Sequence, residues 1–126
     1  AEGACTDSNY GIQYGFPCTF APIADFGLLR SAVEEAERLG VSYKVGNVLS
    51  SDVFYDESST QKTLSRFGVL AVEMEVSALY MNAAAAGKKA LGILSVTDNI
   101  ATGERLSATD RQLKLNDMLE VALGIA

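Results

Sequence analysis

The sequence has no histidine and no tryptophan, and its two cysteines, Cys5 and Cys18, stand 13 residues apart in no recognised motif. Without histidine, the Ser–His and Cys–His routes to an activated nucleophile are closed within these residues. Two separate cysteines do not build a zinc or iron site of the usual kind, so we expect no metal. We interpret them as reduced thiols, which is typical of a cytoplasmic protein.

Positive charge is also scarce, since 10 Lys and Arg against 16 Asp and Glu give a formal net charge of −6. The basic residues are scattered, and without a basic stripe we expect no nucleic acid partner. The apolar runs fall far short of the roughly 20 residues that span a bilayer. No secretory signal is visible, and no G-x-G-x-x-G or Walker motif is present, so neither a membrane partner nor a nucleotide cofactor is expected.

The chain of 126 residues, 48% of them apolar, has the size of one domain, because domains commonly hold roughly 100–200 residues. Segments typical of strands alternate with segments typical of helices, which indicates an α/β fold. A long loop is expected over 7–23. Strands are predicted over 2–6, 41–49, 69–73 and 90–97, and helices over 25–39, 59–66, 75–86 and from 107 onward.

Local signals set the ends of the predicted helices. Asp25 is placed to cap the first helix and Gly40 to stop it, and Gly87 to end the third. Ser107 with Asp110 three residues later resembles a capping box at the start of the last helix. The apolar run 90–97 suits a strand that is covered on both faces.

The predicted strand 69–73 ends in Glu73, and a second carboxylate, Glu75, follows it, with Met74 between the two acids. Alternate residues of an extended chain share a face, so the two acids would point the same way if the strand continued. A carboxylate can accept hydrogen bonds from two hydroxyls, which suits the 2′- and 3′-hydroxyls of a ribose. The alternative is that these acids favour the N-terminus of the next helix for electrostatic reasons.

A third acid, Asp98, follows the apolar run 90–97. Partly buried there, it would suit general acid catalysis, although an ordinary Asp in a turn explains the position too. Arg111 stands thirteen residues further on, in the first turn of the last helix. The intervening loop is long enough to bring its guanidinium beside Asp98, where it would position the charge. The alternative is a surface arginine with a partner in its own helix.

Taken in order, these segments resemble the C-terminal half of hexameric, bacterial-type purine nucleoside phosphorylases. The resemblance covers nearly the whole chain and is weakest over 9–22. Uridine phosphorylases and adenosylhomocysteine nucleosidases are similar in fold, but SVTDN followed by a later arginine favours the purine phosphorylases. The residues that carry it are GACTDS (3–8), IADF (23–26), VGNVLSSDVFY (45–55), VEME (72–75), SVTDN (95–99) and TDRQ (109–112).

The resemblance implies a partial central mixed sheet flanked by helices. It also implies phosphorolysis of purine (2′-deoxy)ribonucleosides to free base and (deoxy)ribose 1-phosphate, with inorganic phosphate as co-substrate and no cofactor. Asp98 matches the general acid that protonates N7 of the base, and Arg111 the arginine that assists it. Glu75 matches the carboxylate that binds the ribose hydroxyls. The other matches are Met74 against the sugar, Phe54 on the base, Val72 and Glu73 lining the base and sugar site, and Thr97 where the family usually has Ser.

The family's phosphate site belongs to an N-terminal half that these residues do not match, and its 5′-hydroxyl contact is a histidine of a neighbouring subunit. We therefore expect no phosphate-binding residue in this chain. We interpret residues 1–126 as the C-terminal portion of a longer phosphorylase, inactive alone and completed by a homo-hexamer or a complementary N-terminal half. A nucleosidase of the same superfamily and a non-catalytic nucleoside-binding module stay open as alternatives.

Overall fold

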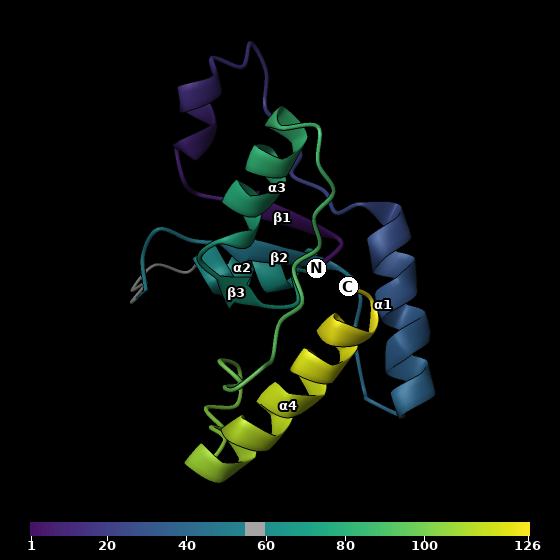
Figure 1. The fold of residues 1–126 in the computed structure, drawn as a ribbon. Helices are drawn as coiled ribbons and strands as arrows, with labels where there is room; N and C mark the ends of the chain where they lie inside the picture. Colours follow the sequence, from purple (N-terminus) through teal and green to yellow (C-terminus); the bar gives the residue numbers. More distant parts are fainter. Residues whose placement is uncertain (55–59) are drawn as a thin grey trace. The chain divides into compact units, whose positions relative to one another are not determined.

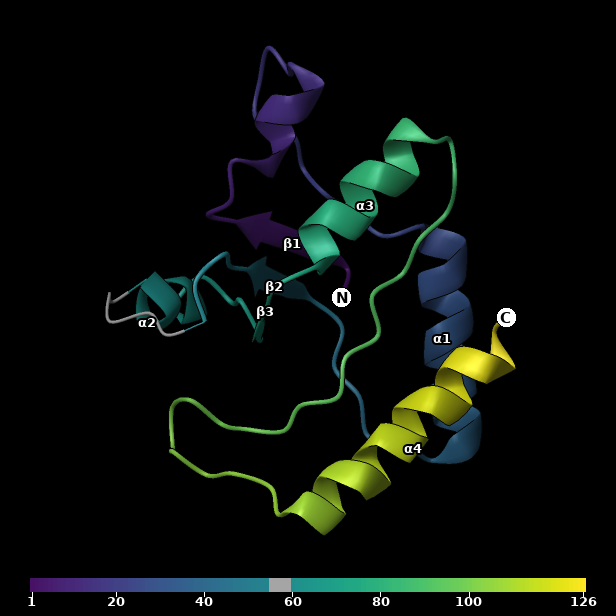
Figure 2. The same ribbon diagram turned by 60° about the vertical axis from the view of Figure 1, so that its left-hand side comes forward.

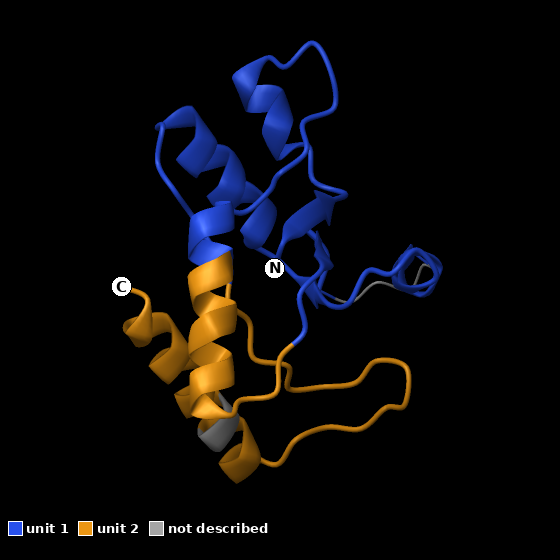
Figure 3. Cartoon of the chain, turned by 90° about the vertical axis from the view of Figure 1, so that its right-hand side faces the viewer, with its two compact units in different colours: residues 1–29, 44–92 blue, residues 30–43, 93–126 orange. Residues whose placement is uncertain are grey.

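The computed structural model describes residues 1–54 and 60–126, apart from the side chains of residues 113 and 114. The chain forms two compact units, residues 1–29 with 44–92 and residues 30–43 with 93–126 (Figure 3). The predicted start of the second helix at Ser59 and the apolar side chain of Leu113 lie outside the described residues. None of the helices described is both long and apolar enough to cross a membrane.

Unit 1 holds a small parallel sheet with the order β1-β2-β3 (Figure 1). Its strands are β1 (Gly3–Thr6), β2 (Asn47–Ser50) and β3 (Val72–Glu73). Thr6 pairs with Ser50, and Ser50 pairs with Glu73, so the three strands end together at one edge of the sheet. The predicted α/β class is confirmed. The expected sheet was mixed, whereas all the strands described in this unit run parallel. Antiparallel pairing among its described residues is limited to one isolated bridge, between Gly3 and Ile23.

Helix α3 (Val76–Ala85) packs on this sheet and forms the core of unit 1. Its Val76 and Tyr80 are buried against Ala4 of β1 and Val48 of β2. Since alternate residues of a strand share a face, Ser50 continues the α3-facing row that Val48 begins. That row therefore ends in a hydroxyl at the N-terminus of α3. The helix closes at Gly87, whose positive φ of 62° suits glycine, as predicted.

The segment 7–23 was predicted as a long loop, and part of it is a 3-10 helix, η1 (Tyr10–Tyr14). Its aromatic side chains form a row, with Tyr14 stacked on Phe16 at 5.5 Å and Phe16 on Phe20 at 4.9 Å between ring centroids. The hydroxyls of Tyr10 and Tyr14 both donate to Oδ1 of Asn82 on α3. These contacts attach the segment to α3.

The strand predicted over 90–97 is absent, which corrects the interpretation of that apolar run. A strand needs a neighbouring backbone, and composition alone does not supply one. The Ala90 carbonyl accepts from the Asp25 amide, and the Gly92 amide donates to the Tyr80 hydroxyl, so neither group joins a ladder. The side chains of Leu94 and Val96 are exposed. Likewise β2 and β3 are shorter than predicted, because residues 41–46 and 69–71 are not in strands.

Helix α1 (Phe26–Leu39) begins and ends where the sequence predicts. Oδ1 of Asp25 accepts a hydrogen bond of 2.9 Å from the Leu28 amide, and Gly40 follows with a φ of 70°. The short helix α2 (Thr60–Ser65) belongs to unit 1. Both confirmed signals at α1 are local, because a cap needs only residues within one turn.

Unit 2 is built on α4 (Ala108–Gly124) and most of α1, and the C-terminal end of α4 lies against α1 (Figure 2). Ser107 caps α4 as predicted, since its hydroxyl oxygen accepts from the Asp110 amide at 3.1 Å and its hydrogen goes to the Asp110 carboxylate. At the other end, a Cβ on Gly124 would lie 2.2 Å from Oε1 of Glu35. A larger residue at position 124 would therefore force the Glu35 side chain to move.

Candidate functional site

Asp98 and Arg111 come together in unit 2. Nη2 of Arg111 donates to Oδ1 of Asp98 at 3.2 Å. Arg111 stands in the first turn of α4, which Ser107 fixes, and the loop 99–106 folds back by hydrogen bonds such as Leu106 N–H to Thr97 C=O at 2.9 Å. The arginine therefore reaches Asp98 across the loop, which is the contact that the thirteen-residue spacing predicts.

Asp98 has two further neighbours. Oδ2 accepts from the Thr97 hydroxyl at 2.8 Å, and Nε of Arg105 lies 3.9 Å from Oδ1. Asp98 and Arg105 also form an isolated antiparallel bridge, which places the second guanidinium beside the same oxygen as Arg111. The Asp98 side chain is 41% exposed and that of Arg105 80% exposed, so the Arg105 contact is weak in water.

Glu73 lies at the end of β3 in unit 1, and its carboxylate turns toward α3. Oε2 accepts from the amides of Glu75 at 2.6 Å and Val76 at 2.7 Å, and Oε1 accepts from the Ser50 hydroxyl. Because β3 ends at Glu73, the extended geometry that would put Glu73 and Glu75 on one face does not continue to Glu75. Helix N-termini favour acids because their amides lack partners, and Glu73 supplies an acceptor there.

Glu75 is the N-cap residue of α3, but its own side chain makes no capping hydrogen bond. Its side chain is exposed, and no hydrogen bond or ion pair to its carboxylate occurs within residues 1–54 and 60–126. Met74 beside it is 40% exposed and Phe54 is 73% exposed, whereas Val72 is half-buried. Of the residues predicted to bind base and sugar, Phe54, Val72, Glu73, Met74 and Glu75 thus belong to unit 1, and Thr97 belongs to unit 2.

Sequence reasoning missed a cluster of polar side chains next to Glu73, formed by Asp7, Ser50 and Ser51. Ser50 and Ser51 are each only 2% exposed. The Ser51 hydroxyl donates to Oδ2 of Asp7 at 2.8 Å, and the Ser50 oxygen accepts from the Ser77 amide at 2.8 Å. A serine at the end of a strand is too common for the sequence alone to indicate that it is buried and hydrogen-bonded in this way.

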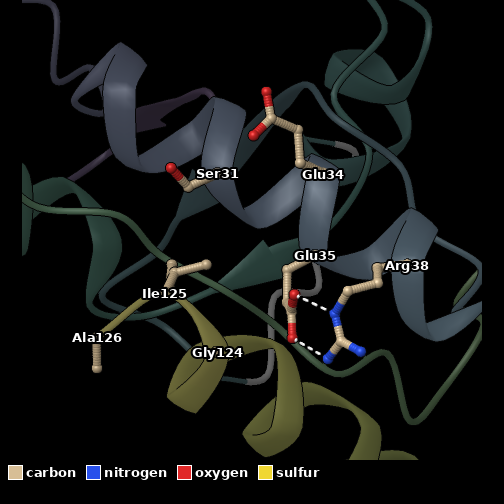
Figure 4. Close-up of a pocket in the computed structure, with 7 residues that line it drawn as sticks. All are labelled: Ser31, Glu34, Glu35, Arg38, Gly124, Ile125 and Ala126. Carbon is tan, nitrogen blue, oxygen red and sulfur yellow. Dashed lines mark hydrogen bonds and ion pairs between the residues drawn. The ribbon is translucent and has the colours of Figure 1, made fainter.

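A cavity of about 420 Å³ in unit 2 is lined by none of the residues predicted for the site. Its carboxylate Glu35 is held by two hydrogen bonds of 2.8 and 2.6 Å from Arg38, which lower the pKa of Glu35 and keep it ionised (Figure 4). Because Arg38 stabilises the charged form of Glu35, this carboxylate is poorly suited to donate a proton. The lining residues are Ser31, Glu34, Glu35, Arg38, Gly124, Ile125 and Ala126.

Metal chemistry has no support in the residues that the structure describes, since no three Cys, Asp or Glu side chains gather there as a metal site would need. The chemistry available is that of carboxylates, hydroxyls and a guanidinium. Asp98 with Arg111 can exchange a proton with a ligand, and Glu75 can accept hydrogen bonds from hydroxyls.

Comparison with known proteins places this arrangement in a family. A family model described as the Phosphorylase superfamily matches residues 1–125. The chain belongs to this superfamily. A DeoD-type purine nucleoside phosphorylase of Geobacillus kaustophilus (strain HTA426) is 48% identical over 126 residues, a match that covers 100% of this chain and 53% of the relative. The corresponding protein of Listeria welshimeri is 46% identical, with 100% and 54% covered. The chain thus spans about half the length of these relatives.

Solved structures agree on the fold. A purine nucleoside phosphorylase from Toxoplasma gondii in complex with immucillin-H superimposes with a TM-score of 0.81 at 19% identity, covering 98% of this chain and 52% of that one. The P. knowlesi homolog of P. falciparum PNP gives a TM-score of 0.80 at 24% identity, covering 98% and 50%. The predicted resemblance to purine nucleoside phosphorylases and the predicted partial phosphorylase fold are both confirmed.

Proposed function

We propose that the protein containing this chain cleaves purine (2′-deoxy)ribonucleosides with phosphate, and that these residues hold the base and the ribose. The observation that carries the proposal is the contact of Arg111 with Asp98 at 3.2 Å. Support comes from the curated purine nucleoside phosphorylases that are 46–48% identical along the whole chain. Proton transfer to the leaving base is the step that such a pair can serve.

In the proposed step, Asp98 gives its proton to N7 of the purine while the bond from C1′ to N9 breaks. The electron pair of that bond stays with the base, which leaves neutral, and an oxygen of phosphate bonds to C1′ from the opposite side. A neutral leaving group lowers the barrier while positive charge grows on the sugar. Asp98 is then a carboxylate, and the hydrogen bond from Arg111 stabilises that charge until solvent returns the proton.

The sugar is assigned to Glu75, whose exposed carboxylate can accept hydrogen bonds from the 2′- and 3′-hydroxyls. Met74 would contact the sugar and Phe54 the base, and Val72 would line the base and sugar site. Thr97, whose hydroxyl donates to Asp98, is assigned to substrate binding beside that acid. Inorganic phosphate is the co-substrate and no cofactor is needed. The phosphate-binding groups are assigned to residues outside this chain, and further copies of the protein, arranged as a hexamer, are its proposed partners in the cytoplasm.

The test is an assay of the polypeptide that the gene encodes, with inosine as substrate and phosphate present or omitted. The proposal expects hypoxanthine to be released only with phosphate, together with one ribose 1-phosphate for each base. If hypoxanthine is released equally without phosphate, with free ribose as the second product, the reaction is hydrolysis and not phosphorolysis. Binding of inosine without cleavage would instead favour a non-catalytic nucleoside-binding module.

A further inference from the structure

The first turn of α3 is capped from outside the helix. The amides that open a helix have no partner within it, and the N-cap side chain usually supplies one. Here the N-cap residue Glu75 makes no such bond. Instead Glu73 accepts from the amides of Glu75 and Val76, and Ser50 of β2 accepts from the amide of Ser77.

Ser50 joins the two halves of this cap. Its hydroxyl hydrogen goes to Oε1 of Glu73 while its oxygen takes the Ser77 amide at 2.8 Å. The position is set by the sheet, because Ser50 pairs with Glu73 in register and is only 2% exposed. A buried hydroxyl that both donates and accepts a hydrogen bond holds its neighbours in one arrangement.

The carboxylate of Glu73 has little capacity left for a substrate. An ionised carboxylate offers about four lone-pair sites, and three hydrogen bonds from Ser50, Glu75 and Val76 already occupy it. By contrast, the side chain of Glu75 is exposed and caps nothing. The two acids of the Glu-Met-Glu segment therefore have different surroundings, one turned inward and one outward.

We propose that Ser50 and Glu73 are positioning residues that fix the backbone of residues 73–75, so that the Glu75 carboxylate is held ready for the sugar hydroxyls. Glu73 then acts through Glu75 and is not itself a ligand of the nucleoside. This inference rests on the proposed function, because it takes Glu75 as the sugar-binding group.

A double-mutant cycle on kcat/KM for inosine tests the coupling in the intact protein. Ser50→Ala leaves the buried Ser77 amide and one Glu73 oxygen without a partner, and we expect a loss on the order of tenfold. In a Glu75→Gln background the same change should cost less than about twofold, because the group that it positions no longer binds normally. Losses that simply multiply would overturn the proposal.

Glu73→Gln is the second variant, should Ser50→Ala fail to fold. Glutamine keeps the shape but has one acceptor oxygen, so it cannot accept all three hydrogen bonds. The same coupling with Glu75→Gln is expected. A Glu73→Gln loss that is independent of position 75 would show Glu73 contacting the substrate directly, and would overturn the inference.

Ser51→Ala is the matched control, since Ser51 is equally buried but its hydroxyl donates to Asp7. Its effect on kcat/KM should be the same in the unmodified protein and in the Glu75→Gln background. If Ser51→Ala couples to Glu75→Gln as strongly as Ser50→Ala does, the coupling reflects general damage to the sheet, and the proposal fails. An unmodified protein that cleaves no purine nucleoside would overturn the proposed function and this inference with it. Activity with independent losses would overturn the inference alone.

Discussion

Replacing Tyr80 by phenylalanine should destabilise unit 1 through two backbone groups. Tyr80 is 2% exposed, and its hydroxyl accepts from the Gly92 amide at 2.9 Å and donates to the carbonyl of Ala1. Phenylalanine keeps the ring, so no large cavity forms. It lacks the hydroxyl, however, so the Gly92 amide and the Ala1 carbonyl both lose their hydrogen-bond partner. A buried donor or acceptor without a partner costs about 1–3 kcal/mol. Gly92 is buried whereas Ala1 is only half-buried and can be hydrated, so we expect a total of about 2–3 kcal/mol.

Thermal unfolding of the intact protein measures this loss, which corresponds to about 5–12 °C in Tm for a domain of this size. Tyr43→Phe is the matched control, because the Tyr43 hydroxyl bonds Glu37 at 2.7 Å on the surface. Its Tm should change much less. A Tyr80→Phe protein that unfolds within about 1 °C of the unmodified one would refute the role given to the hydroxyl.

The same tyrosine predicts a response to alkaline pH. Burial raises the pKa of Tyr80 above its ordinary value. Below about pH 10 the hydroxyl is neutral in both folded and unfolded protein. Above that pH the unfolded chain loses the proton first, so the stability of the unmodified protein falls as the pH rises toward the folded-state pKa. The stability difference between unmodified and Tyr80→Phe proteins should therefore shrink above about pH 10, and a constant difference would contradict the burial argument.

Other expectations concern catalysis and unit 2. Asp98→Asn should lower phosphate-dependent cleavage of inosine by on the order of 10²-fold or more, and a loss below about fivefold would remove Asp98 from the proton-donor role. Arg111→Ala should lower kcat by about tenfold or more, whereas Arg105→Ala should change it less than about twofold, because Arg105 is 3.9 Å away and largely exposed; equal losses would contradict this ranking. Hydrogen bonds from Arg38 lower the pKa of Glu35, so its stabilising effect is present above about pH 4 and is lost as the pH falls through the folded-state pKa. The advantage of the unmodified protein over Glu35→Gln in urea unfolding should accordingly shrink as the pH falls below the ordinary pKa of a glutamate and vanish once the folded-state carboxylate is protonated. An advantage that does not change with pH on the acid side would exclude the ion pair as its cause.

The ends of the helices were predictable because the chemistry that sets them is local. Three residues, Asp25, Gly40 and Ser107, were each predicted to start or stop a helix within one turn of its end. In the structure each lies at that helix end and plays that part. Strands were harder, since a strand exists only beside a partner. The apolar run 90–97 has the composition of a strand, yet its backbone groups at residues 90 and 92 bond elsewhere. Composition therefore overstated the extent of the sheet.

In the candidate site, too, the features set by local sequence could be predicted and those set by distant residues could not. The approach of Arg111 to Asp98 was one of two interpretations of the sequence, supported by the loop length and by the N-cap signal at Ser107, and the structure shows the contact. The different surroundings of Glu73 and Glu75 depend on where β3 stops and on which strand lies beside it. Neither is encoded near those residues. The part played by Ser50 could not be predicted, because its partners come from β3 and α3, more than 20 residues away along the chain.

The outside cap on α3 also bears on how this protein can change over time. In most helices the N-cap side chain is needed for the helix itself, so altering it carries a structural penalty of about 1 kcal/mol. Here residue 75 occupies that position while Glu73 and Ser50 do the capping. Position 75 can therefore accept new side chains while the helix stays formed. Under the proposed assignment of Glu75 to the sugar, sugar preference can thus drift, or be redesigned, at a single codon without first acquiring a compensating stabilising mutation.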